Sequence, residues 1–360
     1  MKKILIVTNH SYMLYQFRQE LIQELLKENE VYISTPFVGH EEDLEALGCH
    51  CINTYVDRRG INPMTDLKLY KVYKEILKEI EPDMVITYSI KPNVYMGFLC
   101  RLKGIKYFAN VQGLGTAFKK EGLATLVSFM YKAALKNVTS VFFENTDNAR
   151  EFVNRKIIKN DKVKVLNGAG INLSKYRYHA FPKDNVTHFL YLGRIMKEKG
   201  MDEWFDAAVK LKKEYKDKVT FEMVGFFEDE YKELVETLQK DGVINFHGFQ
   251  SNPIPFYQKA SCIVLPSYHE GMSNVILEAA ATGRPVITSN IPGCKEAIIN
   301  GETGLLCRVK DHKSLYDKMK QIILMSDEEL EHMGFLGRKH MVQHFDKKKV
   351  VQETYEELMK

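Results

Sequence analysis

Long apolar runs are missing from this sequence. Nowhere among its 360 residues do about 18 apolar residues follow one another, so we expect no helix that spans a membrane. Attachment to a membrane surface stays open. The N-terminal run MKKILIV stops at Thr8 and no small-residue cleavage site follows it. This start therefore indicates a first β-strand rather than a signal peptide.

Signatures of metal binding and of disulfide bonding are also scarce. The six cysteines form no CxxC pair and no zinc spacing, which is typical of the reduced thiols of a cytoplasmic protein. His269 and Glu270 begin an HExxH pattern, but Ser273 stands where the second histidine would be. The sequence has no Asp-x-Asp motif either. We therefore expect no metal site and no bound cofactor.

Charge of one sign is not in excess. The chain has 51 Lys and Arg residues against 47 Asp and Glu residues, and its net charge of +4 is too small for a protein that coats nucleic acid. Residues 1–172 hold 24 basic against 19 acidic residues, whereas the remainder holds 27 against 28. The basic character lies in the first half, where it would favour contact with an anionic membrane surface.

Strand-like and helix-like segments alternate along the whole chain, which predicts an α/β architecture with mostly parallel sheets. With 45% hydrophobic residues, a chain of this length suggests two globular domains. The predicted strands are 4–8, 31–35, 84–88, 107–111, 141–144, 188–192, 219–224, 244–247, 261–265 and 285–288. The predicted helices are 17–27, 66–80, 123–135, 201–215 and 230–240.

A polar, aromatic connector at 172–185 separates two series of such segments. We expect two Rossmann-like, doubly wound domains, 1–172 and 183–344, that face each other across a cleft. Loops at the carboxyl ends of the strands would meet there, which makes them the expected place for a ligand.

The densest chemical signal is the run PSYHEGMSNVILEAAATG, residues 266–283. After a predicted strand, a loop carries Glu270, and a helix begins near Ser273 or Asn274, both good N-cap residues. The free amides and positive dipole end of this helix favour an anion. Glu278 lies about one turn inside the helix. The two carboxylates therefore suit the hydroxyls at each end of a nucleotide-sugar, with the diphosphate between them.

The first predicted strand of the second domain ends in GRIMKEKG, residues 193–200. Gly193 allows the backbone to come close to a ligand. Arg194 and Lys199 lie where they could neutralise a diphosphate and stabilise the negative charge that develops on a leaving phosphate oxygen. Cations near the start of a helix are unfavourable without a nearby anion, which favours an anionic ligand here.

These motifs occur in a specific order. GRIMKEKG, VGFFEDE, FHGF, PSYHEGMSNVILEAAATGRPVI and PGCKEAIINGETGLL follow one another between residues 190 and 306. The ordered set resembles the retaining glycosyltransferases of family four, which have the GT-B fold. The resemblance implies an N-terminal acceptor-binding domain and a C-terminal domain that binds a nucleotide-sugar donor. It also implies that a last helix, at about 345–360, crosses back onto the first domain.

The resemblance implies roles for individual residues. The donor sugar would be held by Glu270 and by the backbone amides of Gly271, Met272 and Ser273. The diphosphate would be held by the amides of Asn274 and Val275 and by the catalytic cations Arg194 and Lys199. Ribose hydroxyls would bind to Glu278, and the nucleotide base would lie against the loops at Gly225, Phe249 and Gln250, with Gly193 close by.

The first half follows the family pattern less closely. The loop TNHSYMLYQF lacks the Gly-Gly pair of many members, and Gln112 stands roughly where many have a histidine. The SIKPN segment and the GLG loop, with Gly115, resemble a subset that acts on lipid-linked or surface-polysaccharide acceptors. The candidate acceptor-side residues are His10, Lys91, Gln112 and Gly113, of which Lys91 is predicted to lie in a loop.

The stretch 116–136 mixes apolar residues with lysines such as Lys119 and Lys120. It fits either a helix packed on the sheet or a face that touches an anionic membrane.

Together the motifs and the resemblance predict a retaining, metal-independent hexosyl transfer from a UDP-sugar to a glycan acceptor. The acceptor would be a polyprenyl-diphosphate-linked or surface-polysaccharide precursor. The enzyme would be cytoplasmic and peripheral to the inner face of the cytoplasmic membrane. Two alternatives stay open: a nucleotide-sugar epimerase or hydrolase of the same architecture, and a non-catalytic nucleotide-sugar-binding protein.

Overall fold

The computed structural model describes residues 1–57, 60, 62–114, 118 and 121–360. The chain folds into two compact units: unit 1 comprises 1–169 with 349–360, and unit 2 comprises 170–348. Gly115, Lys119 and Lys120 lie outside the described residues.

The described part of unit 1 contains a seven-stranded parallel sheet with the strand order β3-β2-β1-β4-β5-β6-β7. Its strands are β1 Lys2–Val7, β2 Asn29–Thr35, β3 His50–Asn53, β4 Met84–Tyr88, β5 Lys106–Val111, β6 Ser140–Phe143 and β7 Val163–Val165. Side chains alternate across the sheet: Leu5 and Val7 pack into one apolar cluster, and Ile4 and Ile6 pack into another on the opposite face. Both faces are therefore buried, as in other sheets made of parallel strands.

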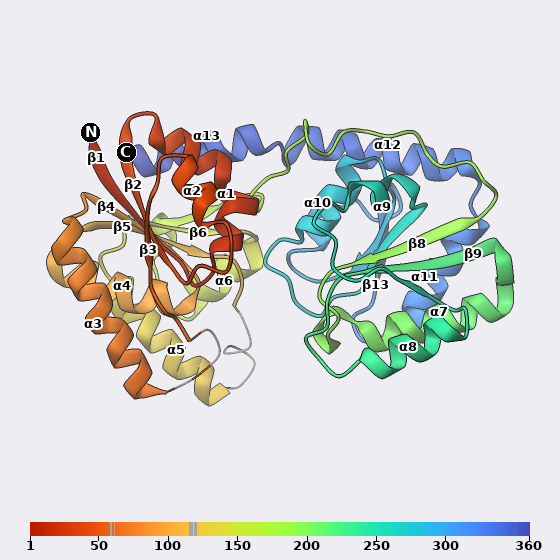
Figure 1. Ribbon diagram of the computed structural model, residues 1–360, viewed down its shortest axis with the longest axis horizontal. Coiled ribbons are helices and arrows are strands. Elements are labelled where there is room, and N and C mark those ends of the chain that lie inside the picture. Colours follow the sequence, from red (N-terminus) through yellow and green to blue (C-terminus); the bar gives the residue numbers. More distant parts are fainter. Residues whose placement is uncertain (58–59, 61, 115–117, 119–120) are drawn as a thin grey trace. The chain divides into compact units, whose positions relative to one another are not determined.

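Helices cover both faces of this sheet (Figure 1). Helices α3 to α5 supply the cluster around Tyr73 and Val127, and α1, α2 and α13 supply the cluster around Leu25 and Val350. The helices are α1 Ser11–Leu26, α2 Glu41–Ala46, α3 Pro63–Ile80, α4 Ile90–Lys103, α5 Glu121–Ala134, α6 Thr146–Asn154 and α13 Lys347–Met359. A short 3-10 helix, η2, spans Asn160–Lys162.

Unit 2 contains a six-stranded parallel sheet with the order β10-β9-β8-β11-β12-β13. Its strands are β8 Thr187–Leu192, β9 Val219–Val224, β10 Asn245–Phe246, β11 Cys262–Leu265, β12 Val286–Ser289 and β13 Gly304–Cys307. Its helices are α7 Met201–Tyr215, α8 Lys232–Lys240, α9 Ile254–Lys259, α10 Asn274–Ala281, α11 His312–Leu324 and α12 Asp327–His344, and its 3-10 helices are η3 Lys197–Lys199, η4 Lys216–Lys218 and η5 Lys295–Ala297. Helices α7, α8 and α11 lie on one side of the sheet, and α9, α10 and α12 lie on the other (Figure 1).

The two strand orders reverse direction at one place in each sheet. In unit 1 the reversal falls between β1 and β4, and in unit 2 it falls between β8 and β11. The loops after these strands diverge to opposite faces of the sheet, which opens a crevice at its carboxyl edge. Both units therefore have a ready place for a ligand at an equivalent topological position.

Two sequence-based expectations differ from the structure. The connector 172–185 belongs to unit 2, because Tyr176 and Phe181 are buried in its core and the Arg284 guanidinium donates to the carbonyls of His179 and Ala180. The prediction of a loop at Lys91 is wrong, since Lys91 lies in the first turn of α4. A proline two residues after the start of this helix is tolerated because first-turn amides have no acceptor within the helix.

Candidate functional site

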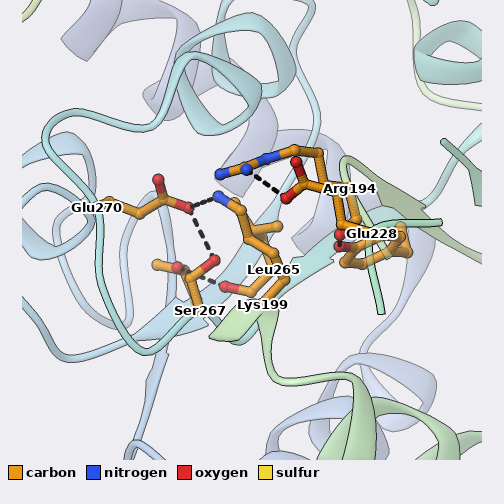
Figure 2. A network of polar contacts seen from close by, with 8 residues as sticks. Arg194, Lys199, Glu228, Leu265, Ser267 and Glu270 are labelled. Carbon is orange, nitrogen blue, oxygen red and sulfur yellow. Dashed lines mark hydrogen bonds and ion pairs between the residues drawn. The ribbon is translucent and has the colours of Figure 1, made fainter. Parts of the chain in front are cut away.

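Lys199 and Glu270 meet at the strand-order reversal of unit 2. Lys199 ends η3 in the segment after β8, and Glu270 lies in the loop after β11. The Lys199 Nζ donates to Glu270 Oε1 over 2.5 Å, and both side chains are nearly buried, with 15% and 13% of their surface exposed. Ser267 Oγ donates to the same oxygen over 2.8 Å. Figure 2 shows the second carboxylate oxygen of Glu270 directed away from these two donors.

Arg194 forms a second ion pair on the same side of the site (Figure 2). Its Nη1 is 2.5 Å from Glu228 Oε2, and 42% of the arginine side chain is exposed. The Tyr191 hydroxyl donates to the Arg194 backbone carbonyl, which fixes the turn after β8. Both predicted cations are therefore held in place by carboxylates, and the Arg194 guanidinium remains open to solvent.

Two glycines permit close backbone contacts around this site. Gly200 has a φ of +75°, and a Cβ there would lie 2.2 Å from the Pro266 carbonyl oxygen. Gly225 has a φ of +156°, and a Cβ there would lie 1.8 Å from the Gly193 carbonyl oxygen. Only glycine fits such positions. The first contact fixes the segment that carries Lys199 against the segment that leads to Glu270.

Helix α10 begins where the sequence predicts, with Ser273 as the N-cap residue and Asn274 as the first helical residue. The Ser273 backbone N–H donates to the Gly293 carbonyl over 2.9 Å. The Ser273 amide therefore has an acceptor within the protein, and its predicted contact with the donor sugar stays a prediction. The first-turn amides of Asn274 and Val275 have no acceptor within the helix, as at any helix start.

Glu278 points into the interior rather than into solvent. Its Oε2 accepts a hydrogen bond from the buried Tyr257 hydroxyl over 2.8 Å, and 9% of the residue is exposed. Burial raises the pKa of Glu278, against the lowering effect of the hydrogen bonds from Tyr257 and Tyr176. Its predicted contact with ribose hydroxyls stays a prediction.

An aromatic pair lies at the edge of unit 2 where the nucleotide base is expected. Phe249 is 57% exposed and Phe226 is 46% exposed, and their rings meet edge to face with centroids 6.2 Å apart. The Gln250 side-chain amide donates to the His247 carbonyl. Sequence reasoning did not name Phe226, although the VGFFEDE motif contains it. Exposed apolar side chains that gather in one patch often mark a contact surface.

A cavity of about 200 Å³, most of whose lining residues are polar, lies at the strand-order reversal of unit 1. It brings together Lys91, Gln112 and Gly113, three of the four candidate acceptor-side residues. The Lys91 Nζ is 2.6 Å from Asp66 Oδ1, and each side chain is 15% exposed. His10 is not among the described residues that line the cavity; it precedes α1, with its ring 6.2 Å from that of Tyr12.

Sequence reasoning did not name several residues that line this cavity: Asn9, Ser89, Asn93, Asn110 and Tyr131. They come from the ends of β1, β4 and β5 and from helices α4 and α5. Only the strand order brings them together, so no local pattern could have identified them as a group.

Among the described residues, no three His, Cys, Asp or Glu side chains gather as a metal-ligand set. None of the helices in the described ranges is both long and apolar enough to cross a membrane.

Comparisons with known proteins agree with the motif order. The family model described as "Glycosyl transferases group 1" matches residues 176–340, and that described as "Glycosyl transferase 4-like" matches residues 3–145. Two similar solved structures are HepE of Anabaena in complex with UDP and glucose (TM-score 0.80, 17% identity, 100% of both chains) and a glycosyltransferase of Rickettsia africae (TM-score 0.78, 20% identity, 100% and 99% of the chains). At these identities the likeness shows the fold, which is GT-B.

Similar sequences include enzymes of bacterial glycan assembly. The chain is 30% identical over 336 residues to the N,N'-diacetylbacillosaminyl-diphospho-undecaprenol alpha-1,3-N-acetylgalactosaminyltransferase of Campylobacter jejuni, and the match covers 88% of each chain. It is 29% identical over 271 residues to the capsular polysaccharide biosynthesis glycosyltransferase CapM of Staphylococcus aureus, covering 70% of this chain and 65% of that one. With its GT-B fold and its ordered motifs, this chain belongs to the family four glycosyltransferases.

Proposed function

We propose that this glycosyltransferase moves a hexosyl group from a UDP-sugar to a polyprenyl-diphosphate-linked glycan, with retention of the anomeric configuration and without a metal ion. The observation that carries the proposal is the Lys199–Glu270 pair at the strand-order reversal of unit 2, followed at once by the start of α10. Cations and free amides suit a diphosphate, and an adjacent carboxylate suits sugar hydroxyls.

In this proposal neighbouring groups of unit 2 each bind one part of the nucleotide-sugar donor. The second oxygen of Glu270 accepts a hydrogen bond from the donor sugar, and the Asn274 and Val275 amides bind the diphosphate. Arg194 and Lys199 provide positive charge to the phosphates, and the ribose reaches Glu278. The base lies near Phe226 and Phe249, whose rings are already exposed.

The chemical step follows from where charge develops. The bond between the anomeric carbon and the diphosphate oxygen breaks, and negative charge grows on the leaving oxygen, which Arg194 and Lys199 stabilise. An acceptor hydroxyl forms the new bond on the same face of the sugar. Its proton passes to the leaving phosphate oxygen, so the products are UDP and the extended glycan. No side chain has to form a covalent intermediate.

The acceptor class is supported by the relatives. The Campylobacter jejuni enzyme is named for a diphospho-undecaprenol acceptor, and we assign a similar lipid-linked glycan to unit 1 of this chain. Lys91, Gln112 and Gly113 line its cavity, and His10 is kept as a further acceptor-side candidate. Leu126 and Phe129 on α5 are 52% and 71% exposed, which suits a peripheral position at the inner face of the cytoplasmic membrane.

The test is a transfer assay with the full chain. Radiolabelled UDP-N-acetylgalactosamine and UDP-glucose are each incubated with a synthetic polyprenyl-diphosphate-linked N-acetylhexosamine, in buffer containing EDTA, and label is measured in the organic phase. We expect label to move into the lipid and NMR of the product to show an α-linkage. Release of UDP at the same rate without acceptor would indicate a hydrolase instead.

A matched pair of arginine variants tests the site. Arg194→Ala should reduce transfer by orders of magnitude, because it removes charge from the leaving phosphate. Arg308→Ala removes an exposed arginine that is also paired with a carboxylate, that of Asp311, and should leave transfer unchanged. Equal activity of the two variants would contradict the assignment.

A further inference from the structure

The cavity in unit 1 has little net charge. Among the described residues that line it, Lys91 alone carries a formal charge, and Asp66 neutralises it across 2.6 Å. The other Asp66 oxygen accepts from the Tyr95 hydroxyl over 2.9 Å. Burial raises the pKa of Tyr131, so its phenol also stays neutral. A phosphate would have to displace Asp66 from Lys91, whereas a neutral ligand would leave this pair intact.

Asn93 presents a buried acceptor in the wall of this cavity. It is 0% exposed, and its amide nitrogen donates to the Asn110 carbonyl over 2.8 Å, which fixes the orientation of the side chain. Its Oδ1 has no hydrogen-bond partner among the described residues. Buried polar atoms are rarely left unpaired. An O–H or N–H donor from a ligand would satisfy this oxygen.

Hydrogen-bond donors also line this cavity of unit 1. Ser89, which precedes α4, makes no side-chain capping bond to the first turn of the helix, and Pro92 has no amide N–H, so the Ile90 and Lys91 amides are the donors that this turn can offer. The Ser89 backbone has a φ of +74°, a strained conformation of the kind that concentrates at binding sites. Gln112 adds an amide that can both donate and accept. A volume of about 200 Å³ with donors and acceptors suits one sugar ring.

We propose that this cavity binds one neutral sugar ring of the acceptor glycan, and that Asn93 Oδ1 selects it by accepting a hydrogen bond from a ring hydroxyl or an N-acetyl amide. The assignment of the ring to the acceptor rests on the proposed function. In this proposal Lys91 does not bind an acceptor phosphate. Its ion pair with Asp66 instead holds the cavity wall in place.

The test measures sugar binding to the full chain by saturation-transfer NMR. The probes are methyl N-acetyl-α-D-galactosaminide, methyl α-D-galactoside and inorganic phosphate. We expect a methyl glycoside to bind to the wild type and to Glu270→Gln, whose change lies in unit 2. Asn93→Leu should weaken this binding about tenfold, the loss expected for one buried hydrogen bond. Phosphate should not displace the sugar.

Asn29→Leu is the matched control. Asn29 is a buried asparagine of unit 1 whose amide also donates to a backbone carbonyl, that of Leu25 over 2.9 Å, but it does not line the cavity. Unchanged binding in Asn93→Leu, loss in Glu270→Gln or displacement by phosphate would overturn the proposal. If Asn93→Leu does not fold, wild-type crystals soaked with the same glycosides decide: density beside Asn93 supports the proposal, and its absence there overturns it.

This binding readout does not depend on turnover. A chain that binds the sugar beside Asn93 but transfers nothing would refute the proposed function while leaving the cavity assignment intact. A chain that transfers sugar but binds no glycoside beside Asn93 would refute the cavity assignment alone.

Discussion

The two strand-order reversals of this chain occupy equivalent topological places, and each holds a nearly buried lysine–carboxylate pair, but the groups around the pair differ. In unit 2 the half-exposed Arg194 and the start of α10 lie near the pair, whereas in unit 1 side-chain amides such as Asn93 and Gln112 line the cavity beside it. Parallel sheets of this type create a crevice wherever the order reverses. The fold therefore places a crevice in each unit, and under the two proposals above the groups around each crevice select a charged ligand in unit 2 and a neutral one in unit 1.

The largest expected effect comes from removing the charge of Glu270, which tests the role of the ion pair in unit 2. Glu270→Gln keeps the side-chain size but loses the ion pair with Lys199 and, under the proposed function, an acceptor for the donor sugar. We expect transfer to fall about 10³-fold, the upper range for loss of one preorganised electrostatic contact, with a modest fall in the melting temperature, because Lys199 keeps an amide oxygen as acceptor but loses its counter-charge. Steady-state transfer kinetics measure the effect, and Glu302→Gln, an exposed glutamate of unit 2, is the control.

Unit 1 also has a buried ion pair between Arg18 and Glu144. We expect its loss to change the stability rather than the transfer rate. The Arg18 guanidinium is 2.8 Å from Glu144 Oε1, with 6% and 12% of the side chains exposed, and it lies over the Tyr88 ring. Arg18→Met leaves Glu144 buried without this partner, which should destabilise unit 1 by about 3 kcal/mol.

Hydrogen exchange of the β5 and β6 amides measures this loss in unit 1 separately from unit 2. The double change Arg18→Met with Glu144→Leu removes both charges and should recover most of the stability. A single variant with unchanged exchange rates would show that the pair is not structural. The two ion pairs thus differ in what their loss mainly changes: the transfer rate for Lys199–Glu270 in unit 2, and the stability for Arg18–Glu144 in unit 1.

Glycine contacts offer a finer distinction within unit 2. Gly200 and Gly301 both have positive φ, +75° and +87°, but a Cβ at Gly301 would meet nothing within 4 Å. Gly301→Ala should cost about 1–2 kcal/mol through backbone strain alone. Gly200→Ala should cost more, because Pro266 also has to move, and it should weaken UDP binding. Thermal unfolding and UDP titration measure both effects; equal behaviour would contradict a role for the Gly200 contact in positioning Lys199.

Local signals in the sequence predicted the parts of the site that depend on local structure. The start of α10 at Asn274 agrees with the predicted start near Ser273 or Asn274, although the Ser273 side chain makes no capping hydrogen bond, and β4 was predicted with its observed bounds. The three-residue strand Val163–Val165 was missed because it is too short to show periodicity. Pro92 concealed the start of α4, since a proline in the first turn looks like a helix breaker when only the sequence is read.

Long-range contacts could not be predicted in the same way. The pairing of Lys199 with Glu270 joins residues that are 71 positions apart, and it depends on the adjacency of β8 and β11. The same holds for the cavity wall. Asn93 and Asn110 come from neighbouring elements, but neither stretch of sequence indicates that these elements are neighbours. The GRIMKEKG and PSYHEG motifs indicated that their residues serve one site, but not which carboxylate each cation contacts.

A smaller effect should distinguish Glu278 from Glu270. Burial raises the pKa of Glu278 above its ordinary value of 4.5, so the folded state binds more protons than the unfolded state between these two values. The stabilising contribution is present below 4.5 and is lost as the pH rises through the folded-state pKa. Glu278→Gln keeps an acceptor for Tyr257, so it should match the wild type at pH 4 and melt higher at pH 7.5. A lower melting temperature of the variant at pH 7.5 would contradict this.

The smallest expected effect concerns the outer side of α5 in unit 1. Leu126 and Phe129 are exposed there, and Lys132 lies in the last turn of the same helix. If this side contacts anionic lipid, the chain should sediment with phosphatidylglycerol vesicles at low salt and be released at high salt, because the lysine contribution is screened.

Replacing Leu126 and Phe129 by Ala should weaken sedimentation several-fold even at low salt, since apolar area no longer enters the lipid. Leu324→Ala changes an apolar residue of unit 2 that is 70% exposed and should leave sedimentation unchanged. Equal loss from Leu324→Ala would assign lipid contact to both units and remove this difference between them.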